Sequence, residues 1–454
     1  MKQLLTTLGV LALLPATAQL NPAITHWLQN NSITGTYYVA GNSTLQQNNI
    51  LVNCQQVEYS ATSVYVHTKG IPAYPTGPFQ DGNPSQASDQ SAIFKFPLTP
   101  QANTGTLQKT TGGNIGVFIN GVALFDYRDG VAWNSTTSAL CGGPGNSPCP
   151  GGPMATMDWN RDAILAERAG FDCAKGHPAM GNYHHHQNPS AFKLDKQVVS
   201  TVCNMYDADG LYAIDSTQHS PLIGFAYDGF PIYGAYAYRN PNGTGGVVRM
   251  KSGYQLRNIT TRTTSPTGAS VTTGPAVSTT YPLGYFREDY EFIAHPGDSS
   301  YLDVHNGRFC KTPEYPNGIY CYFATVDENW NSAYPYVVGP TFYGVYSNAK
   351  VTAVSEATTP YAPTGVLSET AQGIGVRVFP NPVSELLVVQ VTGLLTQPLQ
   401  VELLDGSGRL VRRTTVQAGS TLGYFDCEAL YAGTYQVRCT GAGIAQTHSV
   451  VIAR

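Results

Sequence analysis

The chain has 454 residues, of which 12% are charged and 42% are apolar, and it contains 47 Gly, 30 Pro and 29 Tyr. A net charge of −4 excludes the basic surface that binds a nucleic-acid backbone, and the many aromatic residues exclude wholesale disorder. At roughly 150 residues per domain, the chain is long enough for two to three domains with sizeable cores.

The first 18 residues have the pattern of a secretory signal peptide. Lys2 gives a positive start, residues 8–14 form an apolar run, and Ala16-Thr17-Ala18 provides a small-residue cleavage site. No later apolar run reaches the about 18 to 20 residues that a membrane span needs. We therefore expect an exported protein without a membrane span, whose mature chain begins at Gln19.

Residues 19–352 are predicted to form one large, mainly β domain of strands and long loops with one or a few short helices. Alternating apolar residues predict strands at 57–67, 115–127 and 320–325, and Gly, Pro and Asn interrupt the rest. The one clear helix follows Asp158, which can cap it, and ends at Gly170.

Nine cysteines in an exported chain favour disulfides, because no Cys-x-x-Cys pair indicates a zinc ribbon or a redox centre. An odd number leaves at least one thiol unpaired, and we expect this to be Cys54. Short separations or neighbouring predicted strands make three pairings plausible: Cys141 with Cys149, Cys310 with Cys321, and Cys427 with Cys439.

Four of the ten histidines, His177, His184, His185 and His186, fall within ten residues shortly after the predicted helix. In an extended segment, His184 and His186 project from one face and His185 from the other. Two imidazoles on one face can bind one metal ion, with His177 or a distant ligand completing the shell. Imidazole suits zinc, copper, iron or nickel. The alternative is a rigid hydrogen-bonded network without metal.

Two later segments rich in Tyr and Gly add candidates for the same site. We expect His219 to be the fourth metal-binding residue. With an open coordination position, Asp228 or Glu314 would accept a proton, and Arg308 would bind an anionic group. The alternatives are structural: a turn carboxylate for Asp228, an ion pair with a nearby carboxylate for Arg308, and a loop anchor for Glu314.

Several ordered motifs resemble the YHYH-motif proteins, over roughly residues 50 to 350. These motifs are Ile119-Asn120-Gly121-Val122, Gly181-Asn182-Tyr183-His184-His185-His186, the run from His219 to Gly234, and Leu302-Asp303-Val304-His305-Asn306-Gly307-Arg308. The chain departs from the Tyr-His-Tyr-His motif where His185 replaces the second Tyr, which puts in doubt any role of that phenol on the opposite face. The family is defined by its motif, so the resemblance implies neither a reaction nor catalytic residues.

A linker is predicted at residues 353–373, where Pro, Thr and Gly interrupt a stretch without apolar periodicity. Residues 374–454 then show short apolar alternations separated by turn residues, which predicts a small immunoglobulin-like β-sandwich. We expect its strands at 376–379, 386–391, 399–404, 410–415, 434–439 and 448–452.

Three motifs in this segment are similar to the type A sorting domain of the type IX secretion system of Bacteroidota. They are Phe379-Pro380-Asn381-Pro382, the run from Leu404 to Leu410, and Gly433-Thr434-Tyr435. The resemblance implies that residues 374–454 interact with the secretion machinery, and that the protein is released or held at the outer face of the outer membrane. The alternative is an immunoglobulin-like spacer.

Two classes of function are therefore open. The first is a secreted or surface-attached protein that binds a transition metal, zinc or copper, at His177, His184, His186 and His219. The second is a non-catalytic binding or adhesion module, in which the histidines are structural and the many Tyr residues form a surface for glycans or small molecules. The sequence has no Walker loop, nucleophile elbow, His-Glu-x-x-His or dinucleotide fingerprint, so it assigns no reaction.

Overall fold

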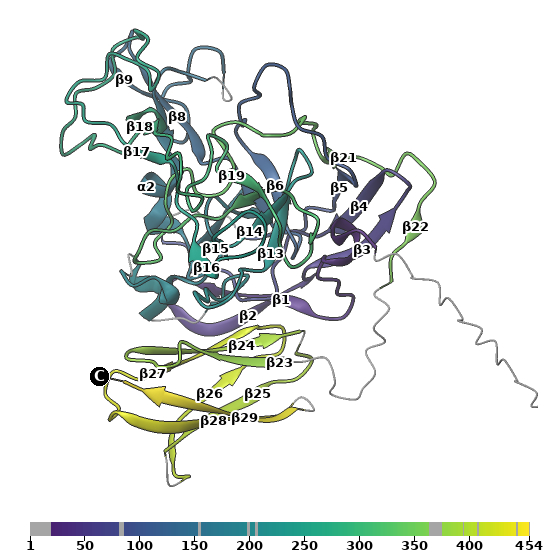
Figure 1. Cartoon of the computed structure of the whole chain (residues 1–454). Helices are drawn as coiled ribbons and strands as arrows, with labels where there is room; N and C mark the ends of the chain where they lie inside the picture. The colour runs from purple at the N-terminus through teal and green to yellow at the C-terminus, as the bar shows by residue number, and fades with distance from the viewer. Residues whose placement is uncertain are drawn as a thin grey trace, which may run out of the picture.

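The computed structural model describes residues 20–80, 86–152, 156–197, 200–204, 208–362, 375–393, 395–405, 408–441 and 444–453. The predicted signal peptide and residues 363–373 of the predicted linker lie outside the described residues. A large strand-rich body is followed by a small C-terminal sandwich, so the fold class predicted from the sequence is confirmed (Figure 1). The helices are short: α1 (Pro22–Thr25), α2 (Ala163–Glu167), and the 3₁₀ turns η1 (Arg168–Gly170), η2 (Phe192–Leu194), η3 (Thr201–Asn204) and η4 (Arg287–Asp289).

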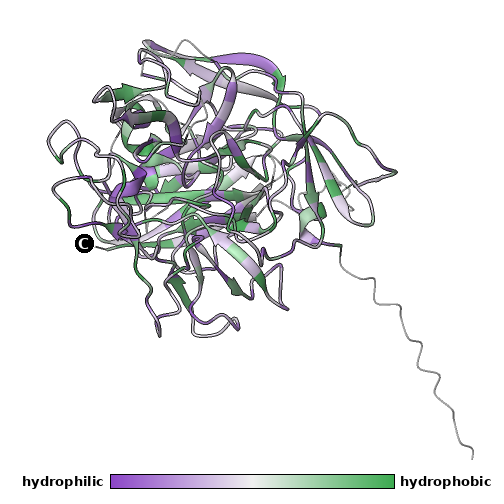
Figure 2. Ribbon diagram, turned by 90° about the horizontal axis from the view of Figure 1, so that it is seen from above, coloured by the Kyte–Doolittle hydropathy of each residue, from purple (hydrophilic) through white to green (hydrophobic). Residues whose placement is uncertain are grey.

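An eight-stranded mixed sheet forms the centre of the body. Two of its strand pairs, β12 with β7 and β14 with β20, are parallel, and the others are antiparallel. Its central strands β6 and β13 are almost wholly buried, and Figure 2 shows apolar segments running through the strands of the interior. In spatial order the strands are β11 (Gly176–Ala179), β12 (Asn182–His185), β7 (Ala123–Phe125), β6 (Asn114–Phe118), β13 (Leu222–Ala226), β14 (Pro231–Tyr233), β20 (Ile319–Phe323) and β19 (Gly307–Cys310).

Smaller sheets surround this centre. The five-stranded sheet contains β21 (Lys350–Val351), β5 (Ala92–Pro97), β4 (Ser63–Thr68), β3 (Cys54–Tyr59) and β22 (Thr359–Pro360). A three-stranded sheet contains β10 (Asn160–Asp162), β8 (Arg128–Asn134) and β9 (Ala139–Cys141). The two-stranded sheets pair β1 (Thr34–Val39) with β2 (Asn42–Leu51), β15 (Tyr236–Tyr238) with β16 (Val247–Arg249), and β17 (Tyr254–Leu256) with β18 (Tyr290–Phe292).

Two of the predicted strands are hairpins in the structure. The segment predicted at 57–67 forms β3 and β4, with a turn in which the Ser60 hydroxyl accepts hydrogen bonds from the backbone N–H groups of Thr62 and Ser63. The segment predicted at 115–127 forms β6 and β7, which are joined at Asn120 and Gly121. Gly121 has a φ of +76°, a conformation that glycine adopts without strain. Apolar alternation continues through both turns, so it does not reveal them.

The predicted helix is shorter than expected because its cap is Asp162, not Asp158. The Asp162 carboxylate accepts hydrogen bonds from the backbone N–H groups of Ile164 and Leu165. The Asp158 carboxylate instead binds the backbone N–H and hydroxyl of Thr272. Helix α2 and the turn η1 therefore extend over residues 163–170.

The C-terminal unit consists of two antiparallel sheets that enclose their own apolar core. The predicted strands are present, and β27 is an additional strand that the sequence did not predict. One sheet contains β23 (Gly375–Phe379), β24 (Leu386–Thr392) and β27 (Leu422–Asp426). The other contains β26 (Leu410–Val416), β25 (Leu399–Leu404), β28 (Gly433–Gly441) and β29 (Ile444–Ile452).

A small mixed contact joins the two units. Phe379, Val388 and Leu422 of the sandwich pack in one apolar cluster with residues of the body, among them Leu194. Beside this cluster, a carboxylate oxygen of Asp209 accepts a hydrogen bond from the backbone N–H of Leu422 at 3.3 Å. The buried Asp209 therefore forms a polar contact between the body and β27.

The disulfides agree with the sequence only in part. Cys141–Cys149 is present as predicted, and Cys173–Cys203 is a second disulfide that the sequence did not predict. Cys54 is a buried thiol, as expected. The predicted pairs Cys310–Cys321 and Cys427–Cys439 are not bonded. The first two cysteines lie diagonally across the β19–β20 ladder. Of the other two, Cys427 directly follows β27, and Cys439 lies in β28 of the other sheet.

Candidate metal centre

The histidine cluster lies on the β11–β12 hairpin at one edge of the central sheet. The register of the hairpin places His177 opposite His184. Because side chains alternate along a strand, His184 and His186 project from one face, and Tyr183 and His185 project from the other. The neighbouring parallel strand β7 holds β12 in place.

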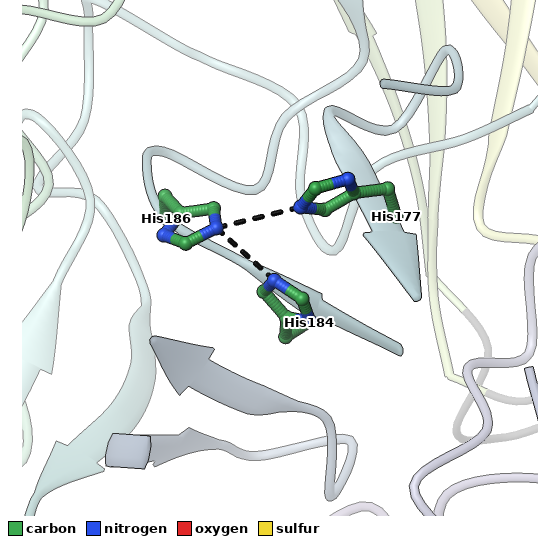
Figure 3. A group of neighbouring side chains, drawn as sticks. All are labelled: His177, His184 and His186. Atoms are coloured by element: carbon green, nitrogen blue, oxygen red, sulfur yellow. Dashed lines mark hydrogen bonds between the residues drawn. The ribbon is translucent and has the colours of Figure 1, made fainter. Parts of the chain in front are cut away.

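The Nε2 atoms of His177, His184 and His186 converge (Figure 3). The Nε2 atom of His186 lies 3.0 Å from that of His184 and 3.4 Å from that of His177. All three residues are buried, with exposed fractions of 6%, 1% and 4% in chain order. Within the described part of the chain, this is the one group of three or more His, Cys, Asp or Glu residues with the geometry to hold a metal ion.

The hydrogen bonds behind the rings determine which nitrogen carries the proton. The Nδ1 atom of His184 lies 2.8 Å from the carbonyl of Asn182, and that of His186 lies 2.6 Å from the carbonyl of Asp126. A carbonyl only accepts, so both Nδ1 atoms carry hydrogen. In the neutral imidazoles the two Nε2 atoms are then both lone-pair acceptors, although they face each other at 3.0 Å. This pair requires a cation between its members, either a proton or a metal ion.

Glu167, at the end of α2, approaches the same point from the more exposed side. Its Oε2 atom lies 3.3 Å from the Nε2 of His177 and 3.4 Å from the Nε2 of His186. Burial by itself raises the pKa of Glu167, but the contacts with these two imidazoles dominate and hold it well below its usual value. The side chain of Glu167 is 25% exposed, so it borders the solvent side of the group.

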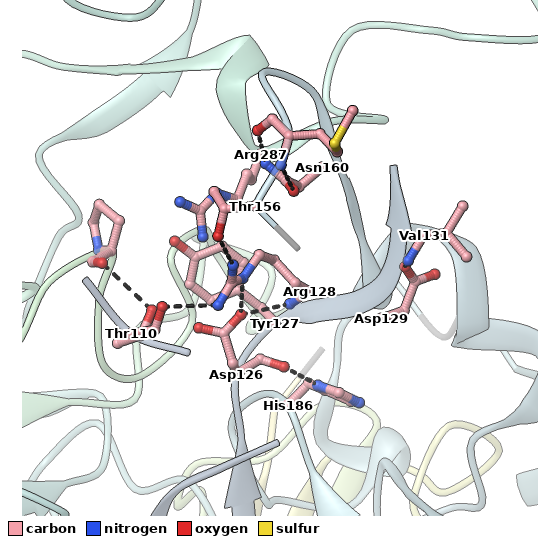
Figure 4. A network of polar contacts seen from close by, with 12 residues as sticks. Thr110, Asp126, Tyr127, Arg128, Asp129, Val131, Thr156, Asn160, His186 and Arg287 are labelled. Atoms are coloured by element: carbon pink, nitrogen blue, oxygen red, sulfur yellow. Dashed lines mark hydrogen bonds and ion pairs between the residues drawn. The ribbon is translucent and has the colours of Figure 1, made fainter. Parts of the chain in front are cut away.

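A polar network fixes the carbonyl that orients His186 (Figure 4). The buried Asp126 carboxylate accepts hydrogen bonds from the backbone N–H and the Nε of Arg128, at 2.9 and 2.8 Å. The Nη2 of Arg128 in turn donates to the carbonyl of Thr110 at 2.8 Å. On the other side, the ring of Phe125 stacks on His184 with 3.7 Å between centroids. The imidazoles of His184 and His186 are therefore held by contacts that are independent of any ligand.

The opposite face of the hairpin is structural. The Tyr183 hydroxyl donates to the Asp172 carboxylate at 2.8 Å. The Nδ1 of His185 lies 3.1 Å from the carbonyl of Lys175, and its Nε2 lies 2.7 Å from the Tyr74 hydroxyl. Burial lowers the pKa of His185 to about 3, so this ring is neutral. His185 thus provides the polar tip that a tyrosine would supply at this position.

Comparison with known protein families agrees with the resemblance to the YHYH-motif proteins that the sequence shows. Residues 93–335, more than half of the chain, match the family described as YHYH protein. The chain belongs to the YHYH protein family. Residues 377–453 match the secretion system C-terminal sorting domain. No curated protein matches the YHYH protein described here.

The sorting domain indicates the export route of the YHYH protein. Such a domain implies interaction with the type IX secretion machinery, and hence a secreted or surface protein. In the described part of the chain, no helix is long and apolar enough to cross a membrane.

The structure does not bring His219 to the three histidines of this YHYH protein. The ring of His219 packs against Tyr233 of β14 and Tyr238 of β15, with centroids 5.2 and 4.9 Å apart. In the central sheet, β14 is four strands away from β12, which corresponds to about 19 Å at ~4.8 Å per strand. The acidic neighbour of the group is instead Glu167.

The three weaker candidates have structural contacts. The Asp228 carboxylate accepts hydrogen bonds from two backbone N–H groups and from the Tyr322 hydroxyl at 2.6 Å. The Arg308 guanidinium donates to three backbone carbonyls, and it donates to no carboxylate among the described residues. Glu314 accepts from the Tyr233 hydroxyl at 2.8 Å. These contacts favour the structural alternatives for Asp228 and Glu314, whereas Arg308 is held by backbone carbonyls in place of the expected ion pair.

Glu167 is the residue of the site that sequence reasoning missed. It lies in the segment read as a helix, ten residues before His177, and no motif singles it out. One signal was available: a carboxylate in the last turn of a helix directly before a histidine hairpin can turn back onto that hairpin.

Proposed function

We propose that this YHYH protein binds one divalent transition-metal ion through the Nε2 atoms of His177, His184 and His186, with an open coordination position beside Glu167. The observation that carries the proposal is the 3.0 Å approach of two Nε2 atoms whose rings both donate through Nδ1. Such an approach is repulsive between neutral imidazoles and favourable around a cation.

The spacing of the nitrogens supports a metal ion. Ligands 2.0–2.1 Å from a tetrahedral ion lie about 3.3–3.4 Å apart. Two of the three separations, those of 3.0 and 3.4 Å from the Nε2 atom of His186, are close to this value, and all three ligand atoms lie within 4.8 Å of one another. Carbonyl groups behind metal-bound imidazoles are the usual device that orients them, and both His184 and His186 have one.

The donor set favours zinc or copper(II). Three imidazoles with a nearby carboxylate suit these borderline ions, and the group contains no thiolate or thioether to favour copper(I). Sites with three protein ligands leave a position for water, whereas structural sites are usually closed by four. The ion would supply Lewis acidity at this position, and Glu167 would accept a hydrogen bond from a water molecule there.

Metal analysis of protein prepared without a histidine tag tests this proposal. After chelation and reloading, the wild-type protein should bind one equivalent of zinc or copper, and His184→Gln and His186→Gln should lose it. The matched control is His219→Gln, which replaces a partly buried histidine outside the group and should keep one equivalent. If wild type and His186→Gln both bind no metal, the cation between the rings is a proton and the site is a rigid network.

We further propose that residues 1–18 direct export to the periplasm and that residues 374–454 direct passage through the outer membrane, after which the protein is released or attached to the surface. The order of the two signals, one at each end of the chain, supports this route. A variant that lacks residues 374–454 should accumulate in the periplasm of a type IX-secreting host. Its appearance in the medium at wild-type levels would contradict the assignment.

A further inference from the structure

A second site lies on the other side of α2 from the histidines. It is a pocket of about 480 Å³ whose wall is formed by α2 and η1, by β17 and β18, and by the loop after β20. Neighbouring residues of this short helical segment face in different directions. Glu167 contacts the histidines, whereas Arg168 lines the pocket. The pocket is therefore separate from the proposed metal site.

Tyrosine rings form much of the pocket wall. Tyr290 stacks on Tyr334 with 3.9 Å between centroids and 2° between planes, and Tyr254 and Tyr334 form a T-shaped pair with 5.4 Å between centroids. Tyr334 is buried, whereas Tyr254 and Tyr290 are only partly buried and line the pocket. Rigid, partly exposed aromatic rings present an apolar face that costs little conformational entropy to order on binding.

The same pocket carries excess positive charge. Arg168, Arg249 and Lys251 line it, against Asp327 and Glu328. The Asp327 carboxylate is already occupied by N–H donors of the next loop, at 2.8 to 3.3 Å. A net excess of cations therefore faces the cavity.

Arg168 is the cation best placed to bind a ligand. Its guanidinium donates to no group in the described part of the chain, whereas Arg249 is held by the carbonyl of Val326 at 2.7 Å. Lys251 makes a 3.5 Å exposed contact with Asp298, an ion pair of little strength, and its ammonium lies 4.7 Å from the centre of the Tyr301 ring. A guanidinium has five donors in a planar fork that matches a carboxylate, so an unpaired one at a pocket wall suits bidentate recognition.

We propose that this pocket binds an acidic saccharide, with Arg168 on the sugar carboxylate and Tyr254 and Tyr290 against the sugar ring. Aromatic faces and a guanidinium together recognise a ligand that is both ring-shaped and anionic. An inorganic anion would use the charge but not the tyrosines, and a neutral sugar would use the tyrosines but not the charge. The proposal concerns a site distinct from the metal centre and stands without it.

Calorimetric titration of the full-length protein with trigalacturonate, galactotriose and sulfate tests the proposal. Trigalacturonate should bind one to one, at least tenfold more tightly than galactotriose or sulfate. Arg168→Gln should weaken trigalacturonate at least tenfold, the loss expected for one charge-assisted hydrogen bond. Arg409→Gln, on the exposed surface of the sorting domain, is the matched control and should have no effect.

The other outcomes overturn the proposal. Equal affinity for sulfate and trigalacturonate would make the pocket a plain anion site. Equal affinity for galactotriose, or an unchanged affinity in Arg168→Gln, would exclude recognition of the carboxylate. Absence of binding at millimolar trigalacturonate would exclude the site altogether. His184→Gln should bind trigalacturonate like wild type, which separates failure here from failure of the proposed metal site.

Discussion

Glu167→Gln tests the role that the structure gives to the carboxylate beside the three histidines. The substitution removes one negative charge but keeps the shape and an acceptor oxygen. Glu167 lies 3.3 and 3.4 Å from two of the Nε2 atoms. For a carboxylate that does not bind the ion directly, we take a separation of about 4 Å between the two charges. The variant should therefore keep one metal ion per chain but bind it more weakly.

The size of the effect follows from Coulomb's law. A divalent ion and a carboxylate 4 Å apart attract each other by ~2 kcal/mol in the dielectric of water. We use this dielectric because the side chain of Glu167 is 25% exposed. An energy of ~2 kcal/mol corresponds to a roughly 30-fold weaker affinity, within the 10- to 100-fold range of residues that support metal ligands.

Competition with a chromophoric chelator measures this change in affinity. Glu314→Gln is the matched control, because Glu314 binds the Tyr233 hydroxyl and not the histidines. Its affinity should equal that of wild type. If Glu167→Gln binds metal within threefold of wild type, the carboxylate does not act on the ion. If it loses metal as completely as His184→Gln, Glu167 is a ligand and the site has no open position.

Three further predictions concern the framework of the site and the contact between the two units. His185→Ala should lower the free energy of unfolding by ~2–4 kcal/mol, because it leaves a cavity and two unpaired polar groups. The variant should still bind one metal ion. Calorimetric unfolding measures the first effect and metal analysis the second, and loss of metal would contradict a purely structural role for this ring. Burial raises the pKa of the Asp209 carboxyl group to about 7, above its value of ~3.9 in the unfolded chain. The protonated carboxyl group is therefore favoured in the folded state. Its contribution to the free energy of unfolding is fully present below about pH 4 and is lost as the pH rises through 7. Asp209→Asn should therefore raise the free energy of unfolding relative to wild type at pH 8, by at most ~4 kcal/mol, and have little effect at pH 4; an equal effect at both pH values would refute this reasoning. Replacing Cys173 and Cys203 by Ala should cost ~3–4 kcal/mol by denaturant unfolding, the loop-closure value for their separation of 30 residues, and an unchanged midpoint would show that the disulfide does not form in the exported protein.

Much of the fold could be predicted from local patterns. Apolar alternation located most strands of the sandwich, because each buries one face. The turn at Ser60 was missed because the alternation continues through it. The strand β27 was missed because Leu422 and Phe425 are separated by two residues and do not alternate.

Site residues on one strand could be predicted from their spacing along the chain. Residues brought together by the order of the strands, or by contacts between distant segments, could not. The spacing of His184 and His186 places both on one face of any extended segment, and the structure has them there. His219 failed as a partner because the order of strands in the sheet, which spacing along the chain does not encode, separates it from β12. Glu167 joined the site through the contacts of its side chain with the hairpin, and such contacts between distant segments are not encoded in local patterns.

The most direct test of the account locates the metal. A crystal of tag-free, zinc-loaded protein should show one anomalous peak at the zinc edge, about 2.0–2.1 Å from the Nε2 atoms of His177, His184 and His186. No such peak should appear in crystals of His186→Gln grown in the same way. Bound zinc with its peak elsewhere, or the three rings in their present arrangement without a peak between them, would contradict a metal centre at this hairpin.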